Sequence, residues 1–228
     1  MWQKNGPANG TIVAGMTSGK MLFAIFYSNI CLIDLPGNAY DQLTNSYGIV
    51  LHPTSGALYI SDYYNHRLMF YASGTRNGTL LLGGNGAGIN NTQLSFHAGL
   101  YLDSFSNTLI IANSGAHSII RYVFGTTTWA LVAGNQNGIW GNTSITFTFP
   151  LDMTFDPMGN MYVVDRGNHR IQFFSNGGIN GITVAGIFGV SGSNATTLLY
   201  PSAVSFDNQL NLYVADTENH RIQKFLRY

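Results

Sequence analysis

The chain has 228 residues with ten basic and ten acidic side chains, so its formal net charge is zero and only 9% of its residues are charged. About a quarter of the residues in an average soluble protein are charged, so this surface depends on uncharged polar groups. A sparse and balanced charge argues against nucleic-acid binding, which needs a basic patch. The length suits one large β domain over residues 1–228.

The first predicted element is a short apolar strand, Thr11 to Ala14, followed by a glycine. The segment MWQKNGPANGTIVAG from Met1 to Gly15 aligns with QFFSNGGINGITVAG from Gln172 to Gly186. The end of the chain has no such run after its last apolar segment, Arg221 to Leu226. We therefore expect Thr11–Ala14 to pair with that segment and cover an edge that would otherwise promote aggregation. The alternative is that both ends are cuts through a longer repeat array.

The second predicted feature is an apolar segment, Lys20 to Gly37, that has no counterpart elsewhere in the chain. The flanking glycines Gly15 and Gly84 are 69 residues apart, against intervals of 50 and 52 in the later units. Two interpretations stay open: a short retained intron in the gene model, or an apolar insertion that packs on the fold or on a partner. A membrane span needs about 20 apolar residues, and Ser28 and Asn29 interrupt this segment. No membrane span is expected.

A repeated hairpin follows and organises the rest of the chain. Three copies read LYISDYYNHRLMFY, MYVVDRGNHRIQFF and LYVADTENHRIQKF, and a fourth, LIIANSGAHSIIRY, keeps only the apolar positions. Their histidines, His66, His117, His169 and His220, are 51 or 52 residues apart. Self-similarity at this period indicates a propeller or a solenoid. Two apolar runs around a polar turn predict a β-hairpin in each copy.

Two further apolar runs complete each unit. One precedes the hairpin, at Gly48–Leu51, Gly99–Leu102, Leu151–Phe155 and Ala203–Phe206, and one follows it, at Thr79–Gly84, Ala130–Gly134 and Ile182–Gly186. No stretch shows sustained helical periodicity with caps. Each unit is therefore predicted to be four strands, which we number first to fourth, with the histidine turn between the second and the third.

The runs VVDRGNHRIQ and VADTENHRIQ, each after a glycine-bounded strand, resemble the NHL repeat, and the resemblance covers roughly Ser46 to Tyr228 plus Thr11 to Gly15. It implies an all-β β-propeller whose blades are four-stranded antiparallel sheets and which serves mainly as a binding platform. A single blade cannot bury both of its faces, so radial stacking of blades supplies the core. Four repeats give a four-bladed ring or a fragment of a larger propeller.

The polar residues of the repeat are expected to be structural. An aspartate precedes each histidine by four residues in three copies and an arginine follows it directly, and a motif present once per blade suits stacking better than a single active site. These turn residues are Asp62, His66, Arg67, His117, Asp165, His169, Arg170, Asp216, His220 and Arg221. No metal site, cofactor site or catalytic motif is evident, and the cysteine, Cys31, stands alone.

The sequence predicts a non-catalytic scaffold that binds a protein partner. Because second-to-third turns and fourth-to-first connections emerge on one side of a blade, we expect the binding face there, with Tyr63, Tyr64, Trp140 and Arg166 as contacts. The resemblance leaves two alternatives, the substrate-recruiting part of a longer ubiquitin ligase and a metal-dependent lyase-like propeller enzyme. No RING-type spacing of cysteine and histidine is present.

The compartment is left open by the sequence. Asn-X-Ser/Thr sequons lie in predicted turns, at Asn9, Asn77, Asn90, Asn142 and Asn194. Their number is what chance gives in a chain so rich in Asn, Ser and Thr, whereas their placement in turns favours an extracellular protein.

Overall fold

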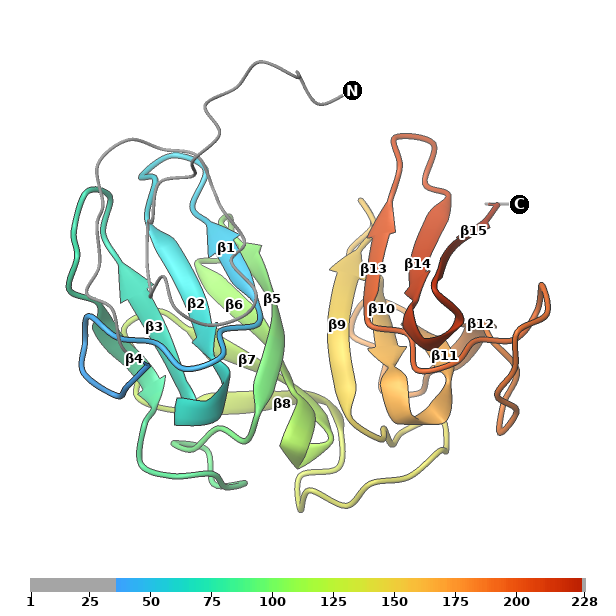
Figure 1. Ribbon diagram of the computed structural model, residues 1–228, viewed down its shortest axis with the longest axis horizontal. Helices are drawn as coiled ribbons and strands as arrows, with labels where there is room; N and C mark the ends of the chain where they lie inside the picture. The colour runs from blue at the N-terminus through green and yellow to red at the C-terminus, as the bar shows by residue number, and fades with distance from the viewer. Residues whose placement is uncertain (1–35, 227–228) are drawn as a thin grey trace.

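The computed structural model describes residues 36–226 as four antiparallel sheets that follow one another in an arc (Figure 1). This confirms the prediction of an all-β propeller architecture with one blade per repeat. The expected strand Thr11–Ala14 and residues 20–35 of the apolar segment lie outside the described residues, so those two expectations stay predictions. Residues 36–226 contain 3-10 turns but no α-helix, and no helix there is long and apolar enough to cross a membrane.

The blades repeat one topology in which consecutive strands are hydrogen-bonded neighbours. Blade 1 consists of β1 (Ile49–Leu51), β2 (Leu58–Asp62), β3 (Arg67–Tyr71) and β4 (Thr79–Gly83). Blade 2 consists of β5 (His97–Asp103), β6 (Thr108–Asn113), β7 (Ser118–Val123) and β8 (Trp129–Gly134). Blade 3 consists of β9 (Pro150–Phe155), β10 (Met161–Asp165), β11 (Arg170–Phe174) and β12 (Ile182–Ala185). Blade 4 consists of β13 (Ala203–Phe206), β14 (Leu212–Asp216) and β15 (Arg221–Phe225), so β15 has no fourth strand beside it within the described residues.

A single 3-10 turn joins the second and third strands of each blade. These turns are η1 (Tyr63–Asn65), η2 (Ser114–Ala116), η3 (Arg166–Asn168) and η4 (Thr217–Asn219). Each ends on the repeat histidine, whose backbone is left-handed with φ between 51° and 56°. A left-handed residue reverses the chain directly into the next strand, which explains why the turn is the same in all four copies.

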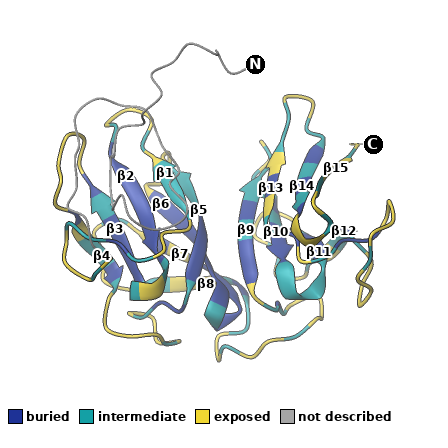
Figure 2. Ribbon diagram, in the orientation of Figure 1, coloured by how far each residue is buried: buried dark blue, intermediate teal, exposed yellow. Residues whose placement is uncertain are grey.

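The core lies in the seams between blades. In the seam between blades 3 and 4, Val164 and Ile171 pack with Val204 and Val214, and all four side chains are buried. Figure 2 shows buried residues along the strands and exposed residues at their ends. Because the side chains of a strand alternate between its two faces, each inner blade supplies one apolar set to the seam on either side.

The repeat histidines also link neighbouring blades. The Nδ1 atoms of His66, His117 and His169 accept hydrogen bonds of 3.0–3.1 Å from the backbone N–H groups of Phe96, Phe149 and Tyr200 in the following blade. Each of these aromatic residues has a positive φ, between 43° and 52°, and its ring meets the imidazole edge to face at 4.4–4.6 Å. We call this pairing the seam latch.

The outer face of blade 4 has no neighbouring blade in the described chain. The second residue of each third strand is Leu68, Ile119, Ile171 and Ile222 in turn. The first three are 0% exposed, whereas Ile222 is 66% exposed. Burial of these equivalent aliphatic side chains therefore depends on the blade that follows and not on their own sheet.

This difference in exposure predicts that the same substitution lowers the free energy of unfolding by different amounts at the two positions. Ile171→Ala should lower the free energy of unfolding by about 2–5 kcal/mol because it leaves a cavity in a closed seam. Ile222→Ala, the matched control at the same repeat position, should change it by about 0.5 kcal/mol or less. Urea unfolding of the two variants measures both values. Equal losses would show that Ile222 is covered in solution and would contradict the exposed outer face.

Candidate functional site

Three of the four turns carry the same aspartate–arginine pair, and its aspartate is buried in each. Arg67 Nε lies 2.6 Å from Asp62 Oδ2, and the corresponding distances are 2.8 Å for Arg170–Asp165 and 2.8 Å for Arg221–Asp216. The other oxygen of each aspartate accepts a backbone N–H from the connection that leads into the blade, as Asp165 does from Thr148 at 2.8 Å. The arginine donates to carbonyls of the same connection, as Arg170 does to Thr143 at 2.7 Å. This geometry meets the requirements of a structural brace.

The surroundings of the three carboxylates differ between blades. Burial raises the pKa of Asp62 and of Asp165, although hydrogen bonds and the paired arginines oppose that effect. Burial acts in the same direction on Asp216, but hydrogen bonds from Leu199, Asn219 and Arg221 outweigh it and lower the pKa of Asp216. Because blade 4 has an exposed outer side, burial weighs less there than in the inner blades.

The degenerate second turn keeps the shape of the brace without its charges. Asn113 Oδ1 accepts the N–H of Ser95 at 2.8 Å, in the place of the aspartate. Ser118 replaces the arginine and is buried. His117 still forms its seam latch with Phe149. The turn geometry therefore does not require the ion pair.

The braces bring two sets of loops onto one side of the arc, which we call the turn face. It consists of the four 3-10 turns and of the connections 36–48, 84–96, 135–149 and 186–202, to which the arginines and aspartates bind. The expectation that these two kinds of loop share a side is confirmed by these contacts. All four residues predicted for binding lie in these loops.

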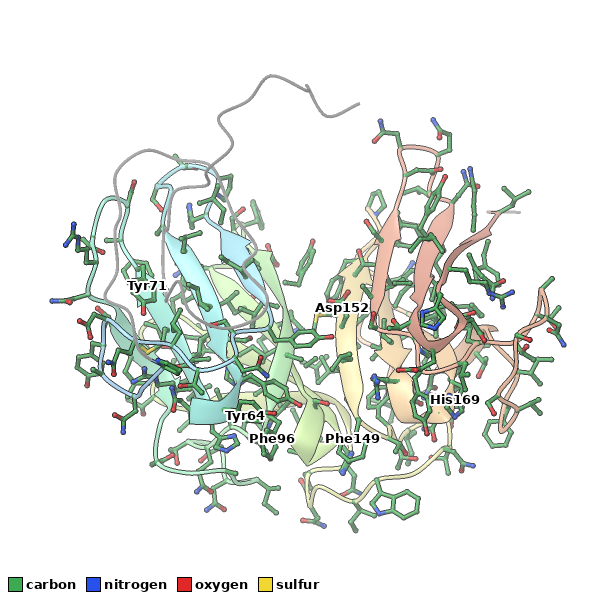
Figure 3. The ribbon with its side chains drawn as sticks, viewed as in Figure 1. Tyr64, Tyr71, Phe96, Phe149, Asp152 and His169 are labelled. Atoms are coloured by element: carbon green, nitrogen blue, oxygen red, sulfur yellow. The ribbon has the colours of Figure 1, made fainter. Side chains whose placement is uncertain are left out.

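Tyr63 and Tyr64 belong to an aromatic cluster at the first turn. The ring of Tyr63 lies 5.3–5.9 Å from the rings of Tyr47, Tyr64 and Phe96. Tyr64 is 54% exposed, and Figure 3 shows it near Phe96 at the lower ends of the strands. Tyr63 is half-buried and supports the exposed ring of its neighbour.

Arg166 lies at the third turn and contacts Tyr200 in the following connection and Glu218 in the fourth turn. Its guanidinium stands 4.9 Å over the ring of Tyr200 and 4.0 Å from Glu218. These residues and Leu199 line an open hollow of about 530 Å³. Burial raises the pKa of Tyr63, and the positive charge of Arg166 acts against that rise.

Trp140 is separate from this group. It is 68% exposed in the connection 135–149, and among the described residues no ring contact or cation–π contact joins it to Tyr63, Tyr64 or Arg166. The structure thus brings Tyr63 and Tyr64 into contact, whereas Arg166 contacts Tyr200 and Glu218 instead. The sequence could not show this, because distances between different blades do not follow from positions within a repeat.

Asp152 was not singled out from the sequence, although it lies at the inner edge of the arc on β9 (Figure 3). The matching positions of the other first strands hold Gly48, Gly99 and Ala203, so a carboxylate occurs in one blade only. Its Oδ2 accepts the N–H of Val204 in the next blade at 3.1 Å. An alignment of the four first strands would have marked it as the one acidic residue at that position.

Glycine is needed at position 99 to accommodate this carboxylate. A Cβ atom on Gly99 would lie 2.6 Å from Asp152 Oδ1, which is closer than van der Waals contact. Burial raises the pKa of Asp152 to about 6, and backbone hydrogen bonds from Val204 and Met153 oppose the rise. No Lys, Arg or His in residues 36–226 forms an ion pair with it.

Metal coordination has no evident site in the described part of the chain. Residues 36–226 contain no group of three His, Cys, Asp or Glu side chains that could hold an ion. The four repeat histidines belong to separate blades, and three of them use Nδ1 in the seam latches.

Comparison with known proteins identifies the repeat and the fold. The NHL repeat model matches residues 147–174 and 198–225, which are the hairpins of blades 3 and 4 with their preceding strands. No curated protein matches the sequence significantly.

Solved structures with the same fold include binding proteins and enzymes. An auxiliary nutrient binding protein from Bacteroides thetaiotaomicron has a TM-score of 0.62 at 23% identity, over 78% of this chain and 46% of that one. A gluconolactonase from Xanthomonas campestris has a TM-score of 0.61 at 18% identity, over 83% and 63%. A virginiamycin B lyase from Staphylococcus aureus has a TM-score of 0.53 at 16% identity, over 83% and 58%. The chain spans about half the length of the first of these, and the likeness shows the fold alone.

The carboxyl of Asp152 should make stability depend on pH in a defined window. Its raised pKa means that the folded state keeps a proton that the unfolded state has lost, so stability falls as the pH rises from about 3.8 to about 6. Asp152→Asn keeps an oxygen for Val204 and removes the titration. The variant should therefore gain stability relative to the parent across this window, up to about 3 kcal/mol.

Urea unfolding of both proteins at several pH values measures this difference, and the titrations shared by the two proteins cancel. A difference that stays constant between about pH 4 and pH 7 would contradict the raised pKa of Asp152.

Proposed function

We propose that this chain, which carries NHL repeats on a β-propeller fold, is a non-catalytic binding module that holds a protein partner on its turn face. The observation that carries this proposal is the concentration of exposed large apolar side chains in the loops of that face. Contiguous exposed apolar surface is uncommon on soluble proteins and marks interaction sites.

The exposed side chains are large and come from the first turn and from two of the connections. They include Tyr64 at 54%, Trp140 at 68%, Phe149 at 51% and Phe188 at 56% exposure. Aromatic residues and arginine dominate the binding energy of protein interfaces, because they bury a large area with few rotatable bonds. The turn face offers these aromatic rings together with Arg166, which suits a protein partner.

The loops that carry these side chains are held in place by buried polar contacts. Each brace ties a turn to the connection beside it, as when Arg67 Nη2 donates to the carbonyls of Ala39 and Gln42, both at 2.8 Å. A loop fixed before binding loses less conformational entropy when a partner arrives. The repeat motif would in this way support binding without touching the ligand.

The alternatives find less support. A lyase or lactonase activity rests on likeness of fold, which does not carry a function by itself. A role in recruiting substrates to a ubiquitin ligase uses the same kind of protein-binding face, and the ligase chemistry would need further domains. The zero net charge gives no support for a nucleic-acid partner.

Replacing the exposed contacts should abolish partner binding without changing the fold. We expect the combined variant Tyr63→Ala, Tyr64→Ala, Trp140→Ala and Arg166→Ala to lose the proteins that the parent chain captures by crosslinking in native extract. A hot-spot residue contributes about 2 kcal/mol or more, so the loss should exceed a hundredfold in affinity for an identified partner.

The matched control replaces exposed apolar residues at the opposite ends of the blades. Phe105 and Met158 are 101% and 71% exposed in the loops between first and second strands. The variant Phe105→Ala with Met158→Ala should capture the same partners as the parent. If the turn-face variant melts like the parent and still binds the same partners, the turn face is not the binding site.

A further inference from the structure

Three connections of the arc carry an Asn-X-Ser/Thr sequon at matching places. The sequons begin at Asn90, Asn142 and Asn194, which are 52 residues apart, the spacing of the repeat itself. Each begins one or two residues after a loop glycine whose N–H binds a carbonyl across the loop, namely Gly88 to Leu94, Gly141 to Phe147 and Gly192 to Leu198. Their return to one loop in three successive blades sets them apart from sequons scattered by chance.

Both functional side chains of each sequon are accessible. The three asparagines and their hydroxyl residues Thr92, Ser144 and Thr196 are all exposed. Asn194 Oδ1 accepts the hydroxyl of Thr196 at 3.0 Å and the N–H of the same residue at 2.9 Å. Its Nδ2, the atom that carries an N-linked sugar, donates no hydrogen bond within residues 36–226. This nitrogen can therefore be substituted without loss of a contact in the fold.

The loop does not need an asparagine for its own shape. In blade 1 the residue at the place of Asn194 is Ala39, and Tyr40 follows it, so that loop has no sequon. Arg67 Nη2 nevertheless donates to the carbonyl of Ala39 at 2.8 Å, as Arg221 Nη2 does to the carbonyl of Asn194 at 2.6 Å. The brace binds the backbone here and does not select the side chain. A requirement of the turn consequently does not account for the sequons.

The sequon loops run beside the outermost strands of the blades. The carbonyl of Asn91 accepts the N–H of Trp129, the first residue of β8, at 2.9 Å. The carbonyl of Ser144 accepts the N–H of Gly181, just before β12, at 2.7 Å. Figure 1 shows the first strands β5 and β9 at the inside of the arc, so the fourth strands form its outer rim. Sugars on these loops would cover strand edges that could otherwise pair with another molecule.

The rim has a surface on which such sugars have a physical role. Leu131 of β8 is 39% exposed, and Ile182 and Val184 of β12 are 64% and 41% exposed. Charged residues are only 9% of the chain, and its formal net charge is zero. A protein without net charge associates readily, and an N-linked oligosaccharide is bulky and solubilising.

We propose that Asn90, Asn142 and Asn194 are acceptors for N-linked oligosaccharides that cover the outer rim of the arc. The proposal does not depend on the proposed function, although the sugar at Asn142 would border the turn face two residues from Trp140.

The modification is a group transfer catalysed by an oligosaccharyltransferase, with a lipid diphosphate-linked oligosaccharide as the donor. The asparagine Nδ2 forms a bond to the anomeric carbon of the first sugar, and the bond from that carbon to the diphosphate oxygen breaks. The diphosphate leaves with the electron pair, and the amide proton passes to a base of the transferase.

The test uses the full protein isolated from the cells that naturally produce it. Peptide N-glycosidase in heavy-oxygen water releases the sugar and converts each glycosylated asparagine into labelled aspartate, which peptide mass spectrometry locates. We expect label at Asn90, Asn142 and Asn194. Asn137, which is exposed and precedes a glycine outside any sequon, reports spontaneous deamidation. It should carry no more label than in a control without the enzyme.

Two variants produced in the same cells test the sequon itself. Thr196→Ala removes the sequon and should abolish the label at Asn194 while leaving it at Asn90 and Asn142. Thr196→Ser is the matched control, because it keeps a hydroxyl at the same place, and it should retain the label at Asn194.

Two results would overturn the inference: no enzyme-dependent label at Asn194 in the parent chain, or label at Asn194 that persists in Thr196→Ala. Missing label at Asn90 or Asn142 would overturn the assignment of that residue. The parent chain decides the question even if a variant does not fold. Partner capture by the turn face is a separate measurement, so either proposal can fail alone.

Discussion

The seam latch is the contact on which the rest of the structure depends. One histidine ends a 3-10 turn with a left-handed backbone, and its Nδ1 accepts the N–H of a residue that leads into the first strand of the next blade, as His117 does from Phe149 at 3.1 Å. Burial lowers the pKa of His66, His117 and His169, so the imidazole stays neutral and can accept a hydrogen bond. A single side chain therefore sets both the turn within a blade and the register between blades.

The braces hold each turn within its own blade, and the seam latches hold neighbouring blades together. The buried pair of Asp165 and Arg170 fixes a turn to its own connection, while His169 fixes that turn to the following blade. The second blade lacks the ion pair but keeps Asn113 and His117, and its turn has the same shape. Hydrogen-bond geometry, rather than net charge, is thus the shared requirement. This agrees with the small net contribution that a buried ion pair makes once desolvation is counted.

The same framework makes the turn face suitable for binding. Hydrogen bonds from the arginines to loop carbonyls hold the loops against the sheet. Tyr64 and Phe149 are therefore exposed on loops whose backbone is held in place. Residues outside the brace also vary between blades, such as Asp152 beside Gly99. A repeat fold can in this way keep one architecture while a single blade acquires a distinct chemical group.

The sequence by itself determined the local order of the chain. The repeat period, the alternation of apolar residues and the recurring turn predicted four-stranded antiparallel units, and the bounds predicted for β13, Ala203–Phe206, were correct. This was possible because strand pairing within a blade joins segments that are neighbours along the chain. The repeated aspartates and arginines were recognised for the same reason. Only the tertiary structure decided that Asp152 of β9 lies against Gly99 of the preceding blade and why Ile222 is exposed when Ile171 is not. Those facts depend on the curvature of the arc and on the order of the blades. A repeat pattern gives the position of a residue within its own blade, but it does not give the distance to a residue in a different blade.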